Sequence, residues 1–335
     1  MAASSGKARR AYLWIIVVAV ALFVALSAAW YFLAAQIDTR VAQAIDEAAA
    51  EGIEIGCPNR AVVGYPFRLG LRCDALTLDQ RAEDLHLAGG ALRTAAQIYR
   101  PNRVVSELEA PLILNAPDAP PLDLRWQLAQ ASAAFWTEGL DRFSLVVEAP
   151  DVALAQPAAG RLPLATAEHL ELHVRRRDGD LDLALTDRGV RVVAPDVPSL
   201  PVFDVALDAT IEDAAEWLDG RVGRTPREAL AGHSATLRTL SVDLGDTGAE
   251  LSGTFRFDEE GRLTGNFDIA LADPERIAAL IAEALPEVAP VVNSVAAALA
   301  FISREEAGRT VISIVVADGI VAAGLIPLGV IPPLE

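Results

Sequence analysis

The segment with the richest ligand chemistry in this chain is His-Leu-Glu-Leu-His at residues 169–173. Alternate residues of a strand share one face, so His169, Glu171 and His173 would lie side by side. Imidazole and carboxylate groups bind zinc. The intervening leucines, however, would form a dry opposite face, and a solvated polar face explains the three residues more simply. No further ligand follows nearby, and we predict no metal site.

Other stretches approach catalytic or ligand-binding motifs without completing them. Gly232–Thr236 reads Gly-His-Ser-Ala-Thr and lacks the final glycine of a nucleophile elbow. Asp178–Asp182 begins as a calcium loop does, but Gly189 stands where the loop requires a glutamate. The only lysine is Lys7, so lysine chemistry is excluded from the rest of the chain. We predict that the protein is not an enzyme, has no catalytic residues and needs no cofactor.

The charge balance excludes another class of function. The chain has 335 residues, with 28 Lys and Arg against 46 Asp and Glu, a net charge of −18. Nucleic-acid binding requires a basic surface, so we predict no nucleic-acid partner. With 52% hydrophobic and 22% charged residues, the chain has the composition of a folded protein.

The elements that position these residues begin with a membrane helix. Residues 11–35 carry no charge, and a bilayer is crossed by about 20 apolar residues. Aromatic residues lie near both ends of this segment, as at the two interfaces of a membrane: Tyr12, Trp14, Trp30 and Tyr31. A cleaved signal peptide is the alternative, but its apolar region is typically only about 7–15 residues long.

The charges around the membrane helix predict its orientation. Lys7, Arg9 and Arg10 precede it, and no acid occurs before Asp38. By the positive-inside rule, residues 1–10 form a cytoplasmic tail and the bulk of the chain is periplasmic. We therefore predict a single-pass protein of the inner (cytoplasmic) membrane with a cytoplasmic N-terminus.

The two cysteines agree with this location. Cys57 and Cys73 lie 16 residues apart, and such a pair in an exported protein indicates a disulfide. Two unpaired buried thiols are the alternative. The enclosed loop contains an apolar group that would either meet a partner or the membrane surface, or pack beneath the loop as local core. This candidate interaction loop consists of Tyr65, Pro66, Phe67 and Arg68; Arg68 would pair with an acid or reach an interfacial phosphate.

Hydrophobic periodicity predicts a mainly β protein with a few helices (α+β). A membrane-proximal helix is expected over residues 36–52, and a β-rich domain over 53–335. Alternation with period two is clean at 122–128, 203–211, 251–257 and 263–271, which is typical of strands with one wet and one dry face.

Glycine-containing turns at 178–179, 260–261 and 318–319 predict antiparallel hairpins. Covering helices are expected near 226–231 and 274–303, the latter including an apolar helix at 288–302. These helices are too few to cover the dry faces of so many strands. We therefore predict a long, mostly antiparallel sheet folded into a groove or a sandwich.

Three stretches carry a family resemblance. They are Cys57-Pro58 with Gly64–Arg68 before Cys73, the run Gly261–Gly265, and residues 311–334 with Asp318-Gly319 and Gly324–Gly329. Together they are similar to an alphaproteobacterial envelope family catalogued as domain of unknown function 2125, over nearly the whole chain. More loosely, an anchor followed by amphipathic strands resembles AsmA-like envelope proteins, which implies a β-groove and lipid handling.

The expected dry face leads to a functional hypothesis. Eight residues are predicted to line the groove: Trp126, Phe203, Val205, Leu207, Phe255, Phe257, Phe267 and Ile269. The protein would be an inner-membrane-anchored periplasmic protein that binds or handles lipid. The alternative is a structural or assembly scaffold without a ligand cavity that binds another envelope protein. The sequence does not predict the oligomeric state.

Overall fold

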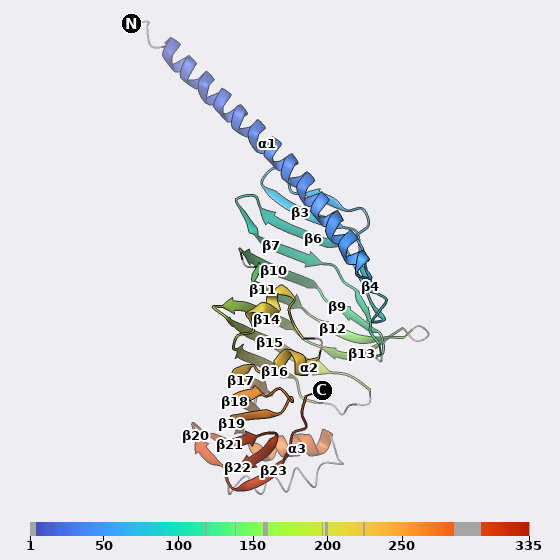
Figure 1. Ribbon diagram of the computed structural model, residues 1–335, viewed down its shortest axis with the longest axis vertical. Helices are drawn as coiled ribbons and strands as arrows, with labels where there is room; N and C mark the ends of the chain where they lie inside the picture. The colour runs from blue at the N-terminus through green and yellow to red at the C-terminus, as the bar shows by residue number, and fades with distance from the viewer. Residues whose placement is uncertain are drawn as a thin grey trace. The chain divides into compact units, whose positions relative to one another are not determined.

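The computed structural model describes residues 5–117, 119–137, 139–156, 160–195, 197, 200–223, 225–284 and 303–334. These residues form 23 strands, three α-helices and one short 3-10 helix (Figure 1). Neighbouring strands run antiparallel, as their registers show. The predicted class, a mainly antiparallel β protein with a few helices, is confirmed. The chain divides into two compact units, Met1–Ala119 and Pro120–Glu335.

The first unit begins with one long helix, α1 (Ser5–Ala50). From Lys7 to Glu51 the sequence has neither glycine nor proline, so nothing interrupts the helix until Gly52, whose φ is +87°. The membrane helix and the membrane-proximal helix expected from the sequence are therefore continuous. This helix is long and apolar enough to span a membrane, and its large side chains between Tyr12 and Val24 are exposed.

Eight strands follow in the first unit. One ladder has the order β1–β4–β5–β8, and another has the order β2–β3–β6–β7. Their bounds are β1 Ile53–Gly56, β2 Ala61–Val63, β3 Arg68–Cys73, β4 Leu76–Gln80, β5 Leu85–Gly89, β6 Leu92–Gln97, β7 Arg100–Leu108 and β8 Leu112–Asn115.

The core of the first unit joins α1 to the second ladder. Trp30 and Ala34 of the helix and Leu69 of β3 are buried together. Cys57 and Cys73 form the predicted disulfide, which excludes the alternative of two free thiols. In the chain-entropy account, a bridge closing a loop of this length stabilises the fold by about 3 kcal/mol. The bridge therefore ties the start of the β-region to β3, the strand that packs against the helix.

The second unit is dominated by one antiparallel ladder, β10–β11–β14–β15–β16–β17–β18–β19–β21, and both β20 and β22 pair with the other edge of β21 (Figure 1). A smaller ladder, β9–β12–β13, joins the end of β15. The bounds are β9 Leu122–Arg125, β10 Leu128–Trp136, β11 Gly139–Glu148, β12 Asp151–Gln156, β13 Gly160–Thr166, β14 His169–Arg177, β15 Asp180–Val192, β16 Phe203–Ile211, β17 Ser234–Asp243, β18 Gly248–Phe257, β19 Leu263–Ala272, β20 Arg304–Glu306, β21 Arg309–Ala317, β22 Ile320–Ala323 and β23 Ile326–Val330. Strand β23 pairs with β22.

The three predicted hairpins are present. They join β14 to β15, β18 to β19 and β21 to β22. At the first turn the positive φ belongs to Asp178 (+56°) and not to the glycine beside it, whereas Asp318 and Gly319 both have positive φ at the last. Asp tolerates this conformation because its short side chain can bond locally to the backbone.

One predicted strand is wrong. The alternating run 122–128 is not a single strand, because β9 ends at Arg125 and β10 begins at Leu128, with Trp126 in the link between them. Asp123, expected on the wet face, is buried at 5% exposure. Its carboxylate lies 3.0 Å from the guanidinium groups of both Arg125 and Arg161, which compensate its charge.

The helices of the second unit are short. Thr225 caps α2 (Pro226–Leu230) by accepting a hydrogen bond from the backbone N–H of Glu228, the expected capping pattern. The carboxylate of Asp273 accepts from the N–H of Arg276 at the start of α3 (Pro274–Ala284). The apolar helix predicted at 288–302 lies outside the described residues.

Candidate functional site: the apolar face of the second unit

The register of the main ladder aligns apolar side chains across eight neighbouring strands. Each member of one row is the direct cross-strand partner of the next, from β11 to β21: Leu145, Leu172, Leu185, Leu207, Leu240, Leu251, Ile269 and Ile312. We call this the leucine row. Cross-strand partners on one face have Cβ atoms only about 5 Å apart, so the row is a continuous apolar band.

A second row runs beside it, two residues along each strand except β17, where a bulge makes the step three: Phe143, Val174, Leu183, Ala209, Leu237, Gly253, Phe267 and Ile314. Both rows lie on one face of the main ladder, and we call this face, with the other residues of the same strands that alternate onto it, the apolar face of the second unit. Of the predicted groove residues, seven lie on this face: Phe203, Val205, Leu207, Phe255, Phe257, Phe267 and Ile269. Trp126 lies in the β9–β10 link and is not brought to it.

The leucine row was only partly visible in the sequence. Leu172 and Leu185 belong to strands whose alternation is as clear as that of the predicted ones, whereas in the strand of Leu240 a bulge interrupts the alternation between Leu237 and Leu240. That alternation was the available signal for placing them on a dry face. Their alignment into one row depends on register between strands, which periodicity does not report.

The phenylalanines gather at one part of this face. The rings of Phe255 and Phe267 stack with centroids 5.7 Å apart, and Phe255 meets Phe257 edge to face at 5.8 Å. Two glycines make room for them, since a Cβ at Gly265 would collide with Phe255 and one at Gly253 with Phe267. Such pairs contribute about 0.5–1.5 kcal/mol beyond the area they bury.

The part of the chain that the structure describes leaves the apolar face incompletely covered. Nearly all its side chains are only partly buried, and Leu240 and Val242 remain 37% and 36% exposed. A sheet face that belongs to a filled core has fully buried side chains. This face therefore leaves apolar surface accessible beside the leucine row.

One end of the face is closed by the 3-10 helix η1 (Ala215–Asp219), which packs against β11, β14 and β15. Arg176 of β14 and Asp219 of η1 form an ion pair of 3.0 Å, with their side chains only 16% and 15% exposed. Gly139 permits the approach, since a Cβ there would meet the carboxylate of Asp219. The apolar face thus ends at a mostly buried, neutralised charge pair.

A single carboxylate interrupts the apolar face. Asp187 of β15 pairs across the ladder with Leu170 on one side and Val205 on the other. Among the described residues, its buried Oδ1 atom has no hydrogen-bond partner. Burial, reinforced by the nearby negative charge of Asp204, raises the pKa of Asp187. A buried polar group without a partner is uncommon and is a point at which the polar part of a ligand can bind.

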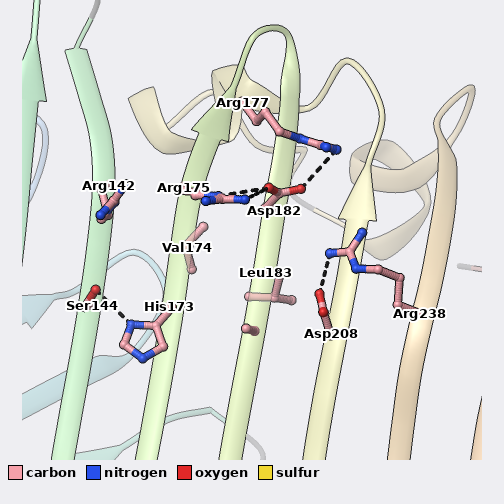
Figure 2. A pocket seen from close by; sticks show the side chains of 11 residues that line it. Arg142, Ser144, His173, Val174, Arg175, Arg177, Asp182, Leu183, Asp208 and Arg238 are labelled. Atoms are coloured by element: carbon pink, nitrogen blue, oxygen red, sulfur yellow. Dashed lines mark hydrogen bonds and ion pairs between the residues drawn. The ribbon is translucent and has the colours of Figure 1, made fainter.

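The opposite face of the same strands carries a polar cavity of about 690 Å³ (Figure 2). Arg175 and Arg177 both approach Asp182, at 2.8 and 3.3 Å, and Arg238 pairs with Asp208 (Figure 2). Burial raises the pKa of Asp182, but the hydroxyl of Thr210, which donates to it at 2.6 Å, and the two arginines outweigh this effect and lower the pKa overall.

Three consecutive arginines, Arg175–Arg177, are divided between the two faces. Arg175 and Arg177 lie on the polar face, whereas Arg176 points to the apolar side and pairs with η1. Among the described residues that line the polar cavity, Arg142 has a side chain without a hydrogen bond or ion pair. The other three arginines of the cavity share the carboxylates of Asp182 and Asp208, so its lining carries more positive than negative groups.

The two histidines singled out in the sequence lie on this polar face. His169 contacts Glu148 at 3.0 Å and Glu171 at 2.7 Å, and its hydrogen bonds to these two carboxylates raise its pKa. His173 contacts Ser144 and Glu171. In the part of the chain that the structure describes, no group of three ligating side chains is arranged to hold a metal ion.

The candidate interaction loop docks on α1. The indole N–H of Trp30 donates to the carbonyl oxygen of Arg68 at 2.7 Å, and the hydroxyl of Tyr65 bonds with that of Ser27 at 2.7 Å. The rings of Trp30 and Tyr65 meet edge to face at 5.4 Å. Phe67, in contrast, is 63% exposed, so the local-core interpretation is wrong for this side chain.

These observations define a class of protein: one N-terminal helix that is long and apolar enough to span a membrane, followed by two antiparallel β-units, the second of which has an apolar face. Residues 30–332 match the model of a family described as uncharacterized proteins conserved in bacteria, DUF2125. The chain belongs to this family, which confirms the resemblance to domain of unknown function 2125. No curated protein matches it.

Proposed function

We propose that this protein is an inner-membrane-anchored periplasmic protein of the cell envelope that holds an acyl chain or a similarly long apolar ligand on the apolar face of its second unit. The observation that carries the proposal is the leucine row, which is continuous over eight strands and only partly covered. A long apolar ligand lying across the strands would bury this surface, at about 25 cal/mol per Å².

The dimensions suit a lipid. Neighbouring strands lie about 4.8 Å apart, so the part of the row from β14 to β21 extends for about 29 Å. The hydrocarbon core of a bilayer is about 30 Å thick, which corresponds to two acyl chains end to end. The face therefore offers one or two acyl chains a path at right angles to the strands, with the Asp187 carboxyl beside it as a polar contact.

The distribution of charged residues along the chain supports the proposed periplasmic location. After Arg10 the chain carries 25 arginines and no lysine against its 46 acids, whereas all the charged residues before the apolar stretch are basic. This asymmetry favours a cytoplasmic N-terminus and a periplasmic remainder. The disulfide, which persists in an oxidising compartment, supports the same side of the membrane.

Retention of lipid by the purified full chain in gentle detergent tests the proposal. Native mass spectrometry and lipid extraction are expected to find stoichiometric lipid on the wild-type protein. Leu240→Glu places a charge on the leucine row at a site that is already 37% exposed, so the fold should tolerate it while lipid retention falls by tenfold or more. Phe255→Glu and Phe267→Glu test the phenylalanine cluster in the same way.

Val315→Glu is the matched control, because Val315 is 48% exposed and pairs with Asn266 on the opposite, polar face. Equal lipid retention by Leu240→Glu and wild type, with both folded, would refute the apolar-face assignment. A lipid-free wild-type mass together with a stoichiometric co-purifying envelope protein would favour the scaffold instead.

A further inference from the structure

A second cavity, in the first unit, has a different chemistry. It lies on β3, β6 and β7, has a volume of about 480 Å³ and combines small apolar walls with three guanidinium groups (strands labelled in Figure 1). Its lining residues are Arg68, Ala95, Ala96, Gln97, Arg100, Arg103 and Val105. We call it the arginine cavity.

The three arginines of this cavity have no acidic partner among the described residues. Among the described residues, Arg68, Arg100 and Arg103 make no side-chain ion pair or hydrogen bond. The chain has 46 acids to 28 basic residues, and a neighbouring arginine of the same ladder, Arg93, lies 2.5 Å from Glu109. Three unpaired guanidinium groups around one cavity therefore form a local positive site on an acidic protein.

Strand register explains how the arginines converge. Arg68 begins β3 and pairs with Gln97, the last residue of β6, which in turn pairs with Arg100 at the start of β7. Arg103 follows on β7, close to the same end of the ladder. The hairpin between β6 and β7 thus brings Arg100 and Arg103 to the end of β3 where Arg68 lies.

This end of the ladder lies beside the boundary of the membrane helix. The carbonyl oxygen of Arg68 accepts the hydrogen bond from Trp30, one of the aromatic residues at the end of the apolar segment. Tyr65, Phe67 and Tyr99 nearby in the chain are 43%, 63% and 72% exposed. Exposed aromatic and arginine side chains at this level are typical of the membrane–water interface.

We propose that the arginine cavity binds the phosphate of an anionic phospholipid in the membrane that α1 spans. A guanidinium fork bonds two phosphate oxygens at once, and three forks without competing carboxylates suit one phosphodiester. Ala95 and Val105 supply apolar contact for the glycerol and upper acyl region. The cavity belongs to the first unit, and this proposal is independent of the ligand proposed for the apolar face.

The test is the headgroup preference of the full chain in detergent, measured by native mass spectrometry with phosphatidylglycerol and phosphatidylcholine of identical acyl chains. Identical chains cancel any contribution of the apolar face, so the ratio of the two affinities reports the headgroup. Wild type is expected to prefer phosphatidylglycerol by about tenfold or more. The triple variant Arg68→Gln, Arg100→Gln, Arg103→Gln should bind both lipids equally, and Arg103→Gln alone should lie between.

The control removes three arginines that are paired elsewhere: Arg81→Gln, Arg93→Gln and Arg262→Gln. It has the same net charge as the cavity triple and should keep the wild-type preference. An equal loss of the phosphatidylglycerol preference in both triple variants would show that net charge, and not the cavity, causes the preference. An unchanged preference in the cavity triple would refute the site.

A third arm uses inorganic phosphate with the wild-type chain. Binding of inorganic phosphate as tight as that of phosphatidylglycerol, and lost in the cavity triple, would assign the cavity to free phosphate and overturn the lipid. Leu240→Glu should lower the affinity for both lipids without changing the ratio of the two affinities. A failure of the apolar-face proposal can therefore be distinguished from a failure of the arginine-cavity proposal.

Discussion

The ion pair that closes the apolar face gives a quantitative prediction. In Asp219→Ala, Arg176 keeps its charge at 16% exposure and loses the carboxylate 3.0 Å away. Breaking a fully buried pair costs about 3–5 kcal/mol, and the residual solvent access here reduces the expected loss to about 2–3 kcal/mol. For a unit of this size that corresponds to a fall in melting temperature of about 4–12 °C.

The assay is thermal unfolding of the full chain in detergent, followed by circular dichroism. Glu216→Ala is the matched control, because Glu216 pairs with Arg221 at 3.1 Å on a surface where both side chains are more than 60% exposed. Exposed ion pairs contribute about 0–1 kcal/mol, so this variant should have nearly the same melting temperature as the wild type.

A second substitution separates lost charge from lost packing. Adding Arg176→Met to Asp219→Ala removes the uncompensated charge and should restore most of the stability. If Asp219→Ala were no more destabilising than Glu216→Ala, the pair would not be effectively buried, and the closed end of the apolar face would be wrongly assigned.

Three further variants test other parts of the structure. Replacing Cys57 and Cys73 with alanine should lower the free energy of unfolding by about 3 kcal/mol in urea titrations, and a stability equal to that of the oxidised wild type would contradict the bridge. Burial raises the pKa of Asp187, so the folded state binds the carboxyl proton more tightly than the unfolded state does. The contribution of this group to stability is therefore full below about pH 4 and is lost as the pH rises through the folded pKa. Asp187→Asn should abolish that decline in unfolding measured from pH 4 to 8, and a pH profile parallel to wild type would show that the carboxyl is well solvated. Trp30→Phe removes the hydrogen bond to Arg68 and should cost about 1 kcal/mol, whereas Trp14→Phe, at an exposed position of the same helix, should not; equal effects would argue against the docked loop.

The features that the sequence predicted well are local ones. The alternation in 203–211 and 263–271 arises within one strand, and β16 and β19 have the predicted dry faces. The turns at Asp318-Gly319 and its counterparts likewise depend on adjacent residues. For the same reason, seven of the eight proposed groove residues fall on one face.

The features that sequence reasoning missed depend on distant partners. The alternating pattern places Asp123 on the solvent-facing side of its strand. It is buried instead because Arg161, 38 positions away, compensates its charge. Arg176 belongs to a run of three arginines, and only the position of Asp219, 43 residues later, explains why it faces the apolar side. The leucine row needs the register of eight strands at once, which no single segment encodes.

The continuity of α1 has a mechanical consequence. The helix has 46 residues, which corresponds to about 69 Å of unbroken α-helix. The docked loop is hydrogen-bonded to it at Trp30. The helix is continuous from its apolar segment to the part that packs against the strands of the first unit. With the helix anchored in a membrane as proposed, a change in its tilt or rotation would move the strands of the first unit by the same angle. Any process that changes bilayer thickness would then alter the angle at which this unit meets the lipid surface.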